Sequence, residues 1–302
     1  MNIVYIVIAT YNSMLWIDRC LLSCEGYPVI IVDNASTDDT VRFVQENYPS
    51  VILLSQTKNL GFGAANNLGI SYALKNNAAY VFLLNQDAYL ESNTIATLID
   101  IHKKNSVYGV LSPIHLNGSG LSLDLNFSNY INVNKSLQYD SLKHNFLKTV
   151  YDVPFVNAAA WLLPRHTLEV VGGFDSLFFH YGEDDNYCHR VLFHGLSIGV
   201  SPLAFVKHDR ELRGGKGILN DDEKLNLKVR AFKLRWANIN INNFEDVFNE
   251  KRKLKRLLIK LFIRLKWGRM RYYLKELRLF NNVIPEIYKS RTLNKNKGSH
   301  YL

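Results

Sequence analysis

Two carboxylates that could bind a nucleotide, directly or through a divalent cation, follow apolar, strand-like runs in the first third of the chain. Asp33 comes directly after the run Val29–Val32, and Asp87 lies three residues beyond the run Tyr80–Leu84. A carboxylate at a strand end can accept from a ribose hydroxyl or a ring N–H, and Asp87 offers the oxygen ligands that Mg²⁺ or Mn²⁺ prefers. The alternatives are a helix cap for Asp33 and a plain turn residue for Asp87.

A second acidic cluster, Glu183-Asp184-Asp185, directly follows the aromatic-rich residues 174–181. Neighbouring apolar rings desolvate a carboxylate and raise its pKa, which suits a general base. The alternative is a solvated turn whose charges are stabilised by the N-terminus of the next helix. His208 is a candidate metal or phosphate ligand, or else a structural histidine.

Small and aromatic residues supply further candidates. The segment Asn59–Gly69 is rich in Gly and Ala, but it does not follow the first strand and lacks the third Gly of a dinucleotide fingerprint. It instead allows close packing or close ligand approach at a helix start, where Asn67 either faces a ligand or is a buried, satisfied amide. Trp161, Phe179 and Tyr181 could form a stacking floor for sugar rings or pack in the core.

The elements that position these residues alternate between strand and helix patterns over residues 3–84. This alternation predicts a largely parallel sheet covered by helices on both faces, in which ligands bind at the carboxyl ends of the strands. Polar residues collect at those ends. They are Thr10, Asp33, Asn34, Asn85 and Asp87.

Later segments have weaker patterns. Residues 115–150 are polar and weakly periodic, and we expect a loop or hairpin excursion there. We expect a mobile, Gly-rich basic loop at Arg210–Gly217 and mainly helical structure over residues 223–280.

Composition excludes several classes of protein. The 302 residues are 47% apolar and 21% charged, which rules out wholesale disorder, and three Cys rule out a disulfide scaffold. Cys20 and Cys24 lack the further Cys or His of a zinc site and are expected to be buried free thiols. The N-terminal run lacks the features of a signal peptide, and no run is long and apolar enough for a transmembrane helix, so we expect a cytoplasmic protein.

The net charge of +9 is concentrated near the end of the chain. Residues 251–302 carry a net charge of +14, whereas the preceding 250 residues carry −5, which argues against a nucleic-acid binder. From Lys251 to Asn281, Leu254, Leu261 and Leu265 recur near helical spacing with cations between them. This pattern predicts an amphipathic basic helix, which either meets an anionic membrane surface or packs on the rest of the protein.

Taken together and in this order, five motifs resemble those of the family 2 glycosyltransferases with the GT-A fold, in particular rhamnosyltransferase-like bacterial polysaccharide enzymes. The motifs are Ile8-Ala9-Thr10-Tyr11-Asn12, residues 32–38 (VDNASTD), residues 59–67 (NLGFGAANN), Leu84-Asn85-Gln86-Asp87, and residues 179–184 (FHYGED).

The resemblance implies an α/β GT-A fold, with a mainly parallel nucleotide-binding sheet flanked by helices and a C-terminal helical extension. The catalytic domain would span residues 1–220, with a nucleotide-sugar half at about 1–112 and an acceptor half at about 151–220, and a basic helical region would span 221–302. The implied reaction is inverting transfer of a sugar from a UDP- or dTDP-sugar to a hydroxyl of a glycan or lipid-linked acceptor. This would occur in bacterial surface polysaccharide synthesis. The basic C-terminal region, and not the resemblance, adds the alternative of a peripheral location on the inner face of the cell membrane.

The resemblance also assigns roles to individual residues. Asp184, with Glu183 beside it, would be the catalytic base, Asp87 and His208 would hold Mn²⁺ or Mg²⁺, and Trp161 and Tyr181 would contact the acceptor. The nucleotide would be bound by Thr10, Tyr11, Asn12, Asp33, Asn34, Asn59, Gly61, Asn67, Asn85 and Gln86. The chain departs from the family pattern at Asn85, where the metal motif usually begins with Asp, and at Asn186, where a second Asp usually follows the Glu-Asp pair.

Two other classes remain open at this stage. A non-catalytic module that binds nucleotide sugars or glycans is suggested by Asn85. A sugar-phosphate nucleotidyltransferase would want a Gly-rich basic loop after the first strand, where this chain has Thr10-Tyr11-Asn12-Ser13.

Overall fold

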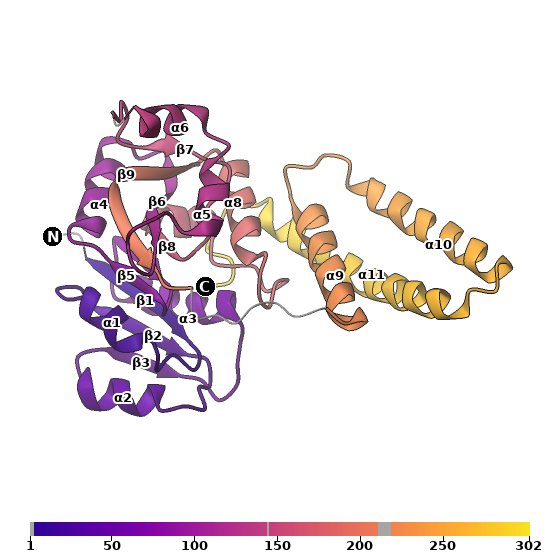
Figure 1. The fold of residues 1–302 in the computed structure, drawn as a ribbon, viewed down its shortest axis with the longest axis horizontal. Coiled ribbons are helices and arrows are strands. Elements are labelled where there is room, and N and C mark those ends of the chain that lie inside the picture. The colour runs from indigo at the N-terminus through magenta and orange to yellow at the C-terminus, as the bar shows by residue number, and fades with distance from the viewer. Residues whose placement is uncertain (1–2, 144, 211–218) are drawn as a thin grey trace. The chain divides into compact units, whose positions relative to one another are not determined.

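The computed structural model describes residues 3–143, 145–210 and 219–302 (Figure 1). Within these residues, one mixed sheet of nine strands is flanked by helices, which confirms the α/β class expected from the sequence. The strands are β1 (Val4–Thr10), β2 (Val29–Asp33), β3 (Ile52–Ser55), β4 (Tyr80–Leu84), β5 (Ala88–Leu90), β6 (Tyr108–Asn117), β7 (Tyr151–Asp152), β8 (Ala160–Pro164) and β9 (Ser197–His208). The helices are α1 (Ile17–Ser23), α2 (Thr40–Asn47), α3 (Phe62–Lys75), α4 (Thr94–Lys104), α5 (Leu125–Ile131), α6 (Lys135–Leu142), α7 (Arg165–Val170), α8 (Glu183–Phe193), α9 (Asp221–Ala237), α10 (Val247–Ile263) and α11 (Trp267–Asn294), with a short 3₁₀ turn at Phe244–Asp246.

The strand order of the sheet is β3-β2-β1-β4-β8-β6-β9-β5, and β7 pairs with β9. The first four strands are parallel, and their register aligns Thr10 with Asp33 at the carboxyl ends of β1 and β2. Strand β8 runs antiparallel to β4. The predicted convergence of polar residues at one edge of the sheet is therefore confirmed for this parallel half.

The core has two halves, one on each face of the sheet. Alternate residues of β1 point to opposite faces, because side chains in a strand alternate with a period of two. Val7 belongs to the cluster that includes α3 and α8, whereas Ile6 and Ile8 belong to the cluster that includes α1 and α4. Gly69 lets α3 approach closely, since a Cβ there would lie 2.4 Å from the Val7 side chain.

Strand β9 contains an irregularity that matters for the site. Its pairing with β6 shifts between Pro113, opposite Ser201, and Ile114, opposite Phe205, so β9 has extra residues at this point. Beyond the shift, β9 also pairs antiparallel with β5, and this pairing places His208 opposite Ala88.

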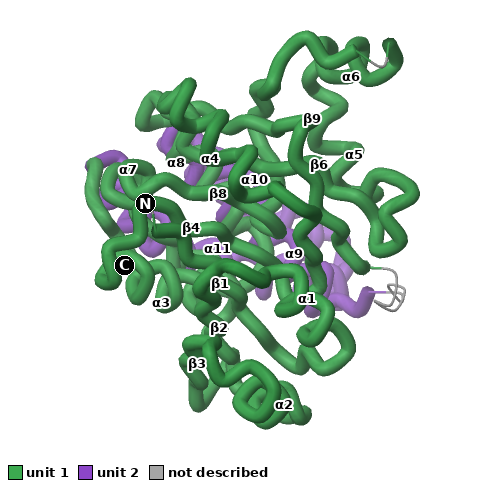
Figure 2. Tube along the Cα trace, turned by 90° about the vertical axis from the view of Figure 1, so that its left-hand side faces the viewer, with its two compact units in different colours: residues 1–214, 297–302 green, residues 215–296 purple. Residues whose placement is uncertain are grey.

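By internal contacts, the chain divides into two compact units (Figure 2). Unit 1 comprises Met1–Gly214 together with Lys297–Leu302, and unit 2 comprises Gly215–Asn296. The sheet and helices α1 to α8 belong to unit 1, while α9, α10 and α11 belong to unit 2.

The prediction of a loop or hairpin over residues 115–150 is wrong in part, because α5 and α6 form within it. Each helix has a side-chain cap: Asp124 accepts from the backbone N–H of Phe127, and Asn134 accepts from that of Leu137. Phe127 and Leu137 are themselves buried. With Ile131, α5 has two buried apolar residues, and α6 has only Leu137, so the helical periodicity in the sequence is short and weak.

The prediction of one amphipathic helix from Lys251 to Asn281 is also wrong. The chain instead forms α10 and α11, with Arg264 and Lys266 as the flanking cap residues and Leu265 between them at φ 51°. Leu254 and Leu261 are buried, whereas Leu265 is exposed. The predicted loop at Arg210–Gly217 lies, beyond its first residue, outside the described residues.

Cys20 and Cys24 are buried free thiols, as expected. Within the described parts of the chain, no helix combines the length and the apolar composition needed to cross a bilayer.

Candidate active site

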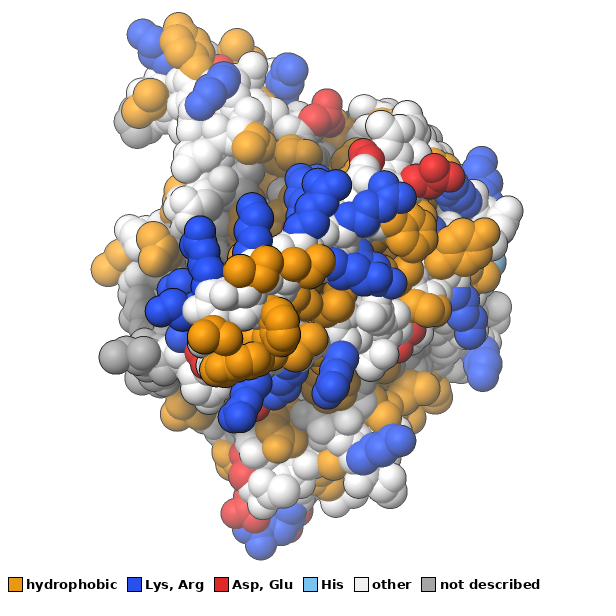
Figure 3. All heavy atoms as spheres, turned by 90° about the vertical axis from the view of Figure 1, so that its right-hand side faces the viewer, with side chains coloured by type: hydrophobic (Ala, Val, Ile, Leu, Met, Phe, Trp, Pro, Cys, Tyr) orange, Lys and Arg blue, Asp and Glu red, His pale blue; other side chains and the backbone are white. Residues whose placement is uncertain are grey.

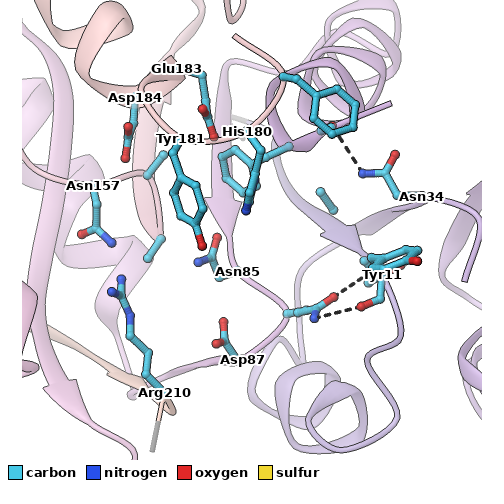
Figure 4. A pocket seen from close by; sticks show the side chains of 18 of the residues that line it. Tyr11, Asn34, Asn85, Asp87, Asn157, His180, Tyr181, Glu183, Asp184 and Arg210 are labelled. Carbon is cyan, nitrogen blue, oxygen red and sulfur yellow. Dashed lines mark hydrogen bonds between the residues drawn. The ribbon is translucent and has the colours of Figure 1, made fainter. Parts of the chain in front are cut away.

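A cavity of about 750 Å³ opens in unit 1 at the carboxyl ends of β1 and β4 (Figure 4). It brings together most of the candidate residues from segments far apart in the chain. Those that line it are Thr10, Tyr11, Asn12, Asn34, Asn59, Gly61, Asn85, Gln86, Asp87, Tyr181, Glu183 and Asp184. In the view of Figure 4, Glu183 and Asp184 lie on one side and Asp87 on the other. The two carboxylates that the sequence analysis assigned to separate roles, Asp87 and Asp184, thus share one cavity.

The loop after β1 is held in place by the loop after β4. The backbone N–H of Tyr11 donates to Oε1 of Gln86 at 2.8 Å, and Nε2 of Gln86 donates to the carbonyl of Tyr11 at 3.3 Å (Figure 4). Asn12 adopts a left-handed φ of 49°, and its Oδ1 accepts from the backbone N–H of Thr37 at 2.8 Å. Because these amides fix the backbone, the half-exposed ring of Tyr11 is free to stack on a planar ligand.

The loop before α3 is braced in a similar way. Asn34 accepts from the backbone N–H of Leu60 and donates to the carbonyl of Gly61, while Asn59 accepts from the backbone N–H of Gly61 at 2.8 Å. These side chains position the segment that forms the cavity wall, so at least part of their role is structural.

Asp33 is buried and does not line the cavity. Its carboxylate accepts from the Thr10 hydroxyl at 3.1 Å and from both the backbone N–H and the hydroxyl of Ser36. The carboxylate of Asp33 thus holds the ends of β1 and β2 together, and its contact with a base stays a prediction.

Asp87, Asn85 and His208 form a cluster at the floor of the cavity. Oδ1 of Asp87 lies 3.4 Å from Nε2 of His208, and Nδ2 of Asn85 lies 3.4 Å from the same nitrogen. The side chains of Asp87 and His208 are completely buried. The β5–β9 pairing produces this proximity, because it aligns the residue after Asp87 with His208. His208 itself stands behind Asp87 and does not line the cavity.

The donor set of this cluster fits a divalent cation. Among the described residues there is no group of three His, Cys, Asp or Glu that could hold a metal ion. However, Oδ1 of Asn85 is buried and has no hydrogen-bond partner. A carboxylate, an amide oxygen and an imidazole suit Mn²⁺ or Mg²⁺ when oxygens of a bound ligand complete the coordination.

Arg210 was missed by the sequence analysis. It lines the cavity, its Nε lies 3.2 Å from His208, and it is 3.5 Å from Oδ2 of Asp124. Its position two residues after His208, at the end of β9, is the one sequence signal that would have identified it. Arg210 thereby places a cation beside the cluster of Asp87 and His208, where a diphosphate would carry negative charge.

Asp184 lies in the first turn of α8, after Gly182 in a left-handed conformation at φ 98°. Burial raises the pKa of the Asp184 carboxyl. Backbone hydrogen bonds, including that from the N–H of Asp185 at 3.0 Å, and the charge of Arg210 offset part of this shift. A desolvated carboxylate with a raised pKa is a stronger proton acceptor than an exposed one, which suits a general base.

The two candidates for contact with an acceptor, Tyr181 and Trp161, lie in different environments. The ring of Tyr181 is 55% exposed at the cavity, and its backbone has a left-handed φ of 66°, which is rare for an aromatic residue and common at functional sites. Trp161 is fully buried between Phe174 and Tyr187 and does not line the cavity. The prediction that Trp161 contacts an acceptor is therefore wrong, because its side chain belongs to the core.

Asn67 is likewise not a cavity residue. Its Nδ2 donates to the carbonyl of Phe174 at 2.8 Å, and its Oδ1 accepts from the backbone N–H of the same residue at 2.7 Å. The prediction of nucleotide contact is corrected to the structural alternative, a buried amide that joins α3 to the loop before α8.

Comparison with known proteins shows similarity to glycosyltransferases. A sequence profile of "Glycosyl transferase family 2" matches residues 5–169. The dTDP-rhamnosyl transferase RfbF of Shigella flexneri is 24% identical over 212 residues, which are 68% of this chain and 68% of that protein. The N-acetylglucosaminyl-diphospho-decaprenol L-rhamnosyltransferase of Mycobacterium tuberculosis is 26% identical over 243 residues, which are 71% of this chain and 78% of that protein.

Solved structures share the fold. S. aureus TarS 1-349 in complex with UDP aligns with 98% of this chain and 88% of its own at a TM-score of 0.56 and 15% identity. The mannosyltransferase PcManGT from Pyrobaculum calidifontis, in complex with GDP-Man and Mn²⁺, aligns with 78% of this chain and 63% of its own at a TM-score of 0.54 and 20% identity.

The expected GT-A fold is thus confirmed by the structural neighbours. The profile match covers more than half of the chain and includes β1, β2, β4 and the loops that form one side of the cavity. The chain is therefore a member of glycosyl transferase family 2, and the curated proteins that it resembles include rhamnosyltransferases.

Proposed function

We propose that the protein transfers a sugar, with inversion, from a UDP- or dTDP-sugar to a hydroxyl of a glycan or lipid-linked acceptor during synthesis of a bacterial surface polysaccharide. The observation that carries the proposal is the shared cavity of Asp87 and Asp184. The rhamnosyltransferase relatives, one of them named for a dTDP-sugar and the other for a diphospho-decaprenol, support the donor and acceptor classes.

The donor would lie between the loops after β1 and β4. Tyr11 would stack on the base, and the braced backbone of residues 59–61 would line the nucleoside. Arg210 would pair with the diphosphate as a positively charged donor of hydrogen bonds. These contacts orient the anomeric carbon toward the opposite side of the cavity.

Asp87, Asn85 and His208 would hold Mn²⁺ or Mg²⁺ at the floor. When bound, such an ion neutralises charge on the diphosphate and stabilises its departure. Asn85 contributes a neutral oxygen in place of a carboxylate, so we expect weak binding of the ion in the absence of nucleotide.

The carboxylate of Asp184 would take the proton from the acceptor hydroxyl as that oxygen attacks the anomeric carbon. The bond to the nucleoside diphosphate breaks on the opposite face of the sugar, which inverts the anomeric centre. A positioned general base contributes about 10²–10⁴-fold to such a step. Tyr181, at the mouth of the same cavity, would provide the stacking surface for the acceptor ring.

The test is donor turnover measured with purified protein, a panel of UDP-, dTDP- and GDP-sugars, and Mn²⁺ or Mg²⁺. We expect one donor class to raise the melting temperature and to be hydrolysed slowly without acceptor. Release of a nucleoside diphosphate from no donor, together with unchanged thermal stability, would contradict the proposal.

Asn85 favours a second candidate, a module that binds nucleotide sugars without turning them over. The same experiment separates the two functions, because thermal stabilisation by a donor without any hydrolysis or transfer would support the binding module. Synthesis of a nucleotide sugar from a sugar phosphate and a nucleoside triphosphate would instead indicate a nucleotidyltransferase.

A further inference from the structure

The end of the α10–α11 hairpin, residues 259–271, carries large apolar side chains that unit 2 leaves in contact with water. We call this segment the hairpin tip. Its apolar residues are Ile259 (61% exposed), Phe262 (57%), Ile263 (72%), Leu265 (67%) and Trp267 (47%). Figure 3 shows apolar side chains on this face gathered together and bordered by Lys and Arg. Such a cluster of exposed apolar residues marks an interaction surface.

These side chains are not needed to pack the hairpin. Leu254 and Leu261 of α10 are buried, whereas Ile259, Phe262 and Ile263 lie on a different face of the same helix. Phe262 packs edge-to-face against Trp267, with ring centroids 5.6 Å apart. This contact links the last turn of α10 to the first turn of α11 and groups the apolar side chains around the connection.

The charge around the tip has a single sign. Residues 251–275 contain eleven Lys or Arg and no Asp or Glu. Lys260, Arg264, Lys266, Arg269 and Arg271 are all exposed. No ion pair involves these five cations among the described residues, so their charges face solvent. A surface with this charge fits a partner that carries a high density of negative charge.

Exposed apolar side chains and cations occur together at the hairpin tip, and this combination favours one class of partner. A nucleic acid would account for the cations but not for five exposed apolar side chains. A second copy of the same surface would bring like charges together. An anionic bilayer accounts for both features, because its headgroups attract the cations and its acyl region accepts the apolar residues. Since no helix within the described residues could cross a membrane, the tip would lie at the membrane surface.

We propose that the hairpin tip binds the surface of an anionic lipid bilayer, with Phe262, Ile263, Leu265 and Trp267 entering the boundary between headgroups and acyl chains. The surrounding Lys and Arg would remain at the headgroups. This inference rests on the surface of unit 2 alone and does not depend on glycosyl transfer.

The test uses the full chain and flotation with vesicles of phosphatidylcholine that contain about 30% phosphatidylglycerol. Phosphatidylglycerol is anionic and gives the vesicles a negative surface potential. We expect the wild-type protein to float with these vesicles and not with pure phosphatidylcholine. Binding should weaken as salt rises, because exposed charges are screened. Replacing Lys260, Arg264 and Arg269 together with Gln should lower the partition coefficient about a hundredfold, at roughly fivefold per cation.

The apolar contribution is tested with the triple variant Phe262→Ser, Ile263→Ser and Trp267→Ser. It should lose binding by at least about tenfold, because burial of these side chains drives insertion. The matched control replaces three exposed leucines of unit 1 with Ser, at Leu121, Leu142 and Leu147, which are 90%, 82% and 74% exposed. The control should bind as the wild type does, and circular dichroism of both triple variants confirms folding.

Trp267 provides a direct readout of insertion. Trp161 and Trp236 are buried, and Trp16 of unit 1 is partly buried. The part of a blue shift of tryptophan emission on addition of anionic vesicles that Trp267→Phe removes therefore reports on Trp267. Trp267→Phe should abolish the shift while it retains most of the binding. Equal binding by wild type and the Ser triple variant, or no binding by either, would overturn the proposal. Self-association or nucleic-acid binding that the triple variant loses, without vesicle binding by the wild type, would overturn it too.

Discussion

The backbone of Gly61 lies directly against the carbonyl of Phe179, so that a Cβ on residue 61 would be 2.1 Å from the Phe179 oxygen. This contact joins the loop before α3, on the donor side of the cavity, to the loop that leads into α8 and Asp184. No side chain fits between them, which explains why Gly occurs in this motif.

Gly61→Ala should therefore separate the two loops and lower kcat/KM by at least tenfold. Gly195→Ala is the matched control, because Gly195 has a similar positive φ of +77°, compared with +83° at Gly61, but nothing lies within 4 Å of its added Cβ. Both variants carry the strain of a left-handed Ala, about 1 kcal/mol, so both should lose some thermal stability. An equal loss of activity in the two would show that strain and not the contact is responsible.

Asp184→Asn should reduce transfer by about 10²–10⁴-fold, because an amide cannot accept the acceptor proton. Donor affinity, measured by calorimetry, should change little. Asp185→Asn is the control, since Asp185 is the neighbouring acid and does not line the cavity. Transfer by Asp184→Asn at the wild-type rate would exclude Asp184 as the base.

The same substitution should affect stability in a pH-dependent way. Burial raises the pKa of Asp184 in the folded protein above its ordinary value, so ionisation of this group disfavours folding. The cost is absent below the unfolded-state pKa and is complete once the pH exceeds the raised folded-state pKa. Asp184→Asn should therefore melt at a higher temperature than wild type at neutral pH and at the same temperature near pH 3, as differential scanning calorimetry can measure.

Asp87→Ala should remove the metal dependence of nucleotide binding. We expect the affinity in Mn²⁺ to fall about tenfold or more, to the value that the wild type has in EDTA. Asn85→Asp should act in the opposite direction, because a second carboxylate strengthens a site for a divalent cation. Isothermal titration with Mn²⁺ checks both, and unchanged Mn²⁺ affinity in Asn85→Asp would place the ion elsewhere.

Arg210→Ala should raise the KM for the donor by about tenfold, whereas Arg210→Lys should recover part of the loss because the charge is kept. The effect should be largest for diphosphate donors and small for the nucleoside alone. Equal losses for nucleoside and diphosphate would indicate that Arg210 acts only by holding Asp124 and His208 in place.

The sequence predicted the parallel half of the sheet well, because β-branched runs alternate there with amphipathic helices. It also predicted that Asp87 and Asp184 would share a cleft. It could not predict which face of a fully buried strand a residue occupies: β8 is buried at every position, so nothing in its pattern distinguished Trp161 as a core residue.

Other features depend on contacts between distant segments. Asn67 resembles a ligand-facing amide until its partner, the backbone of Phe174, is known. Arg210 enters the cavity because β9 pairs with β5, a pairing between residues more than a hundred positions apart. The hairpin of α10 and α11 reverses at Leu265, where the sequence retains a helical repeat of apolar residues.

The extra residues in β9 between Ser201 and Phe205 determine to which face of the sheet each later side chain of that strand points. Ala204, Val206 and His208 point inward, while Leu203 and Phe205 point outward, and a change of one residue in the irregular segment would invert this alternation. Insertion of one residue would bring Lys207 to the place of the imidazole beside Asp87, and deletion of one residue would bring Asp209 there. The length of this irregular segment of β9 thus decides whether the side chain behind Asp87 is a histidine.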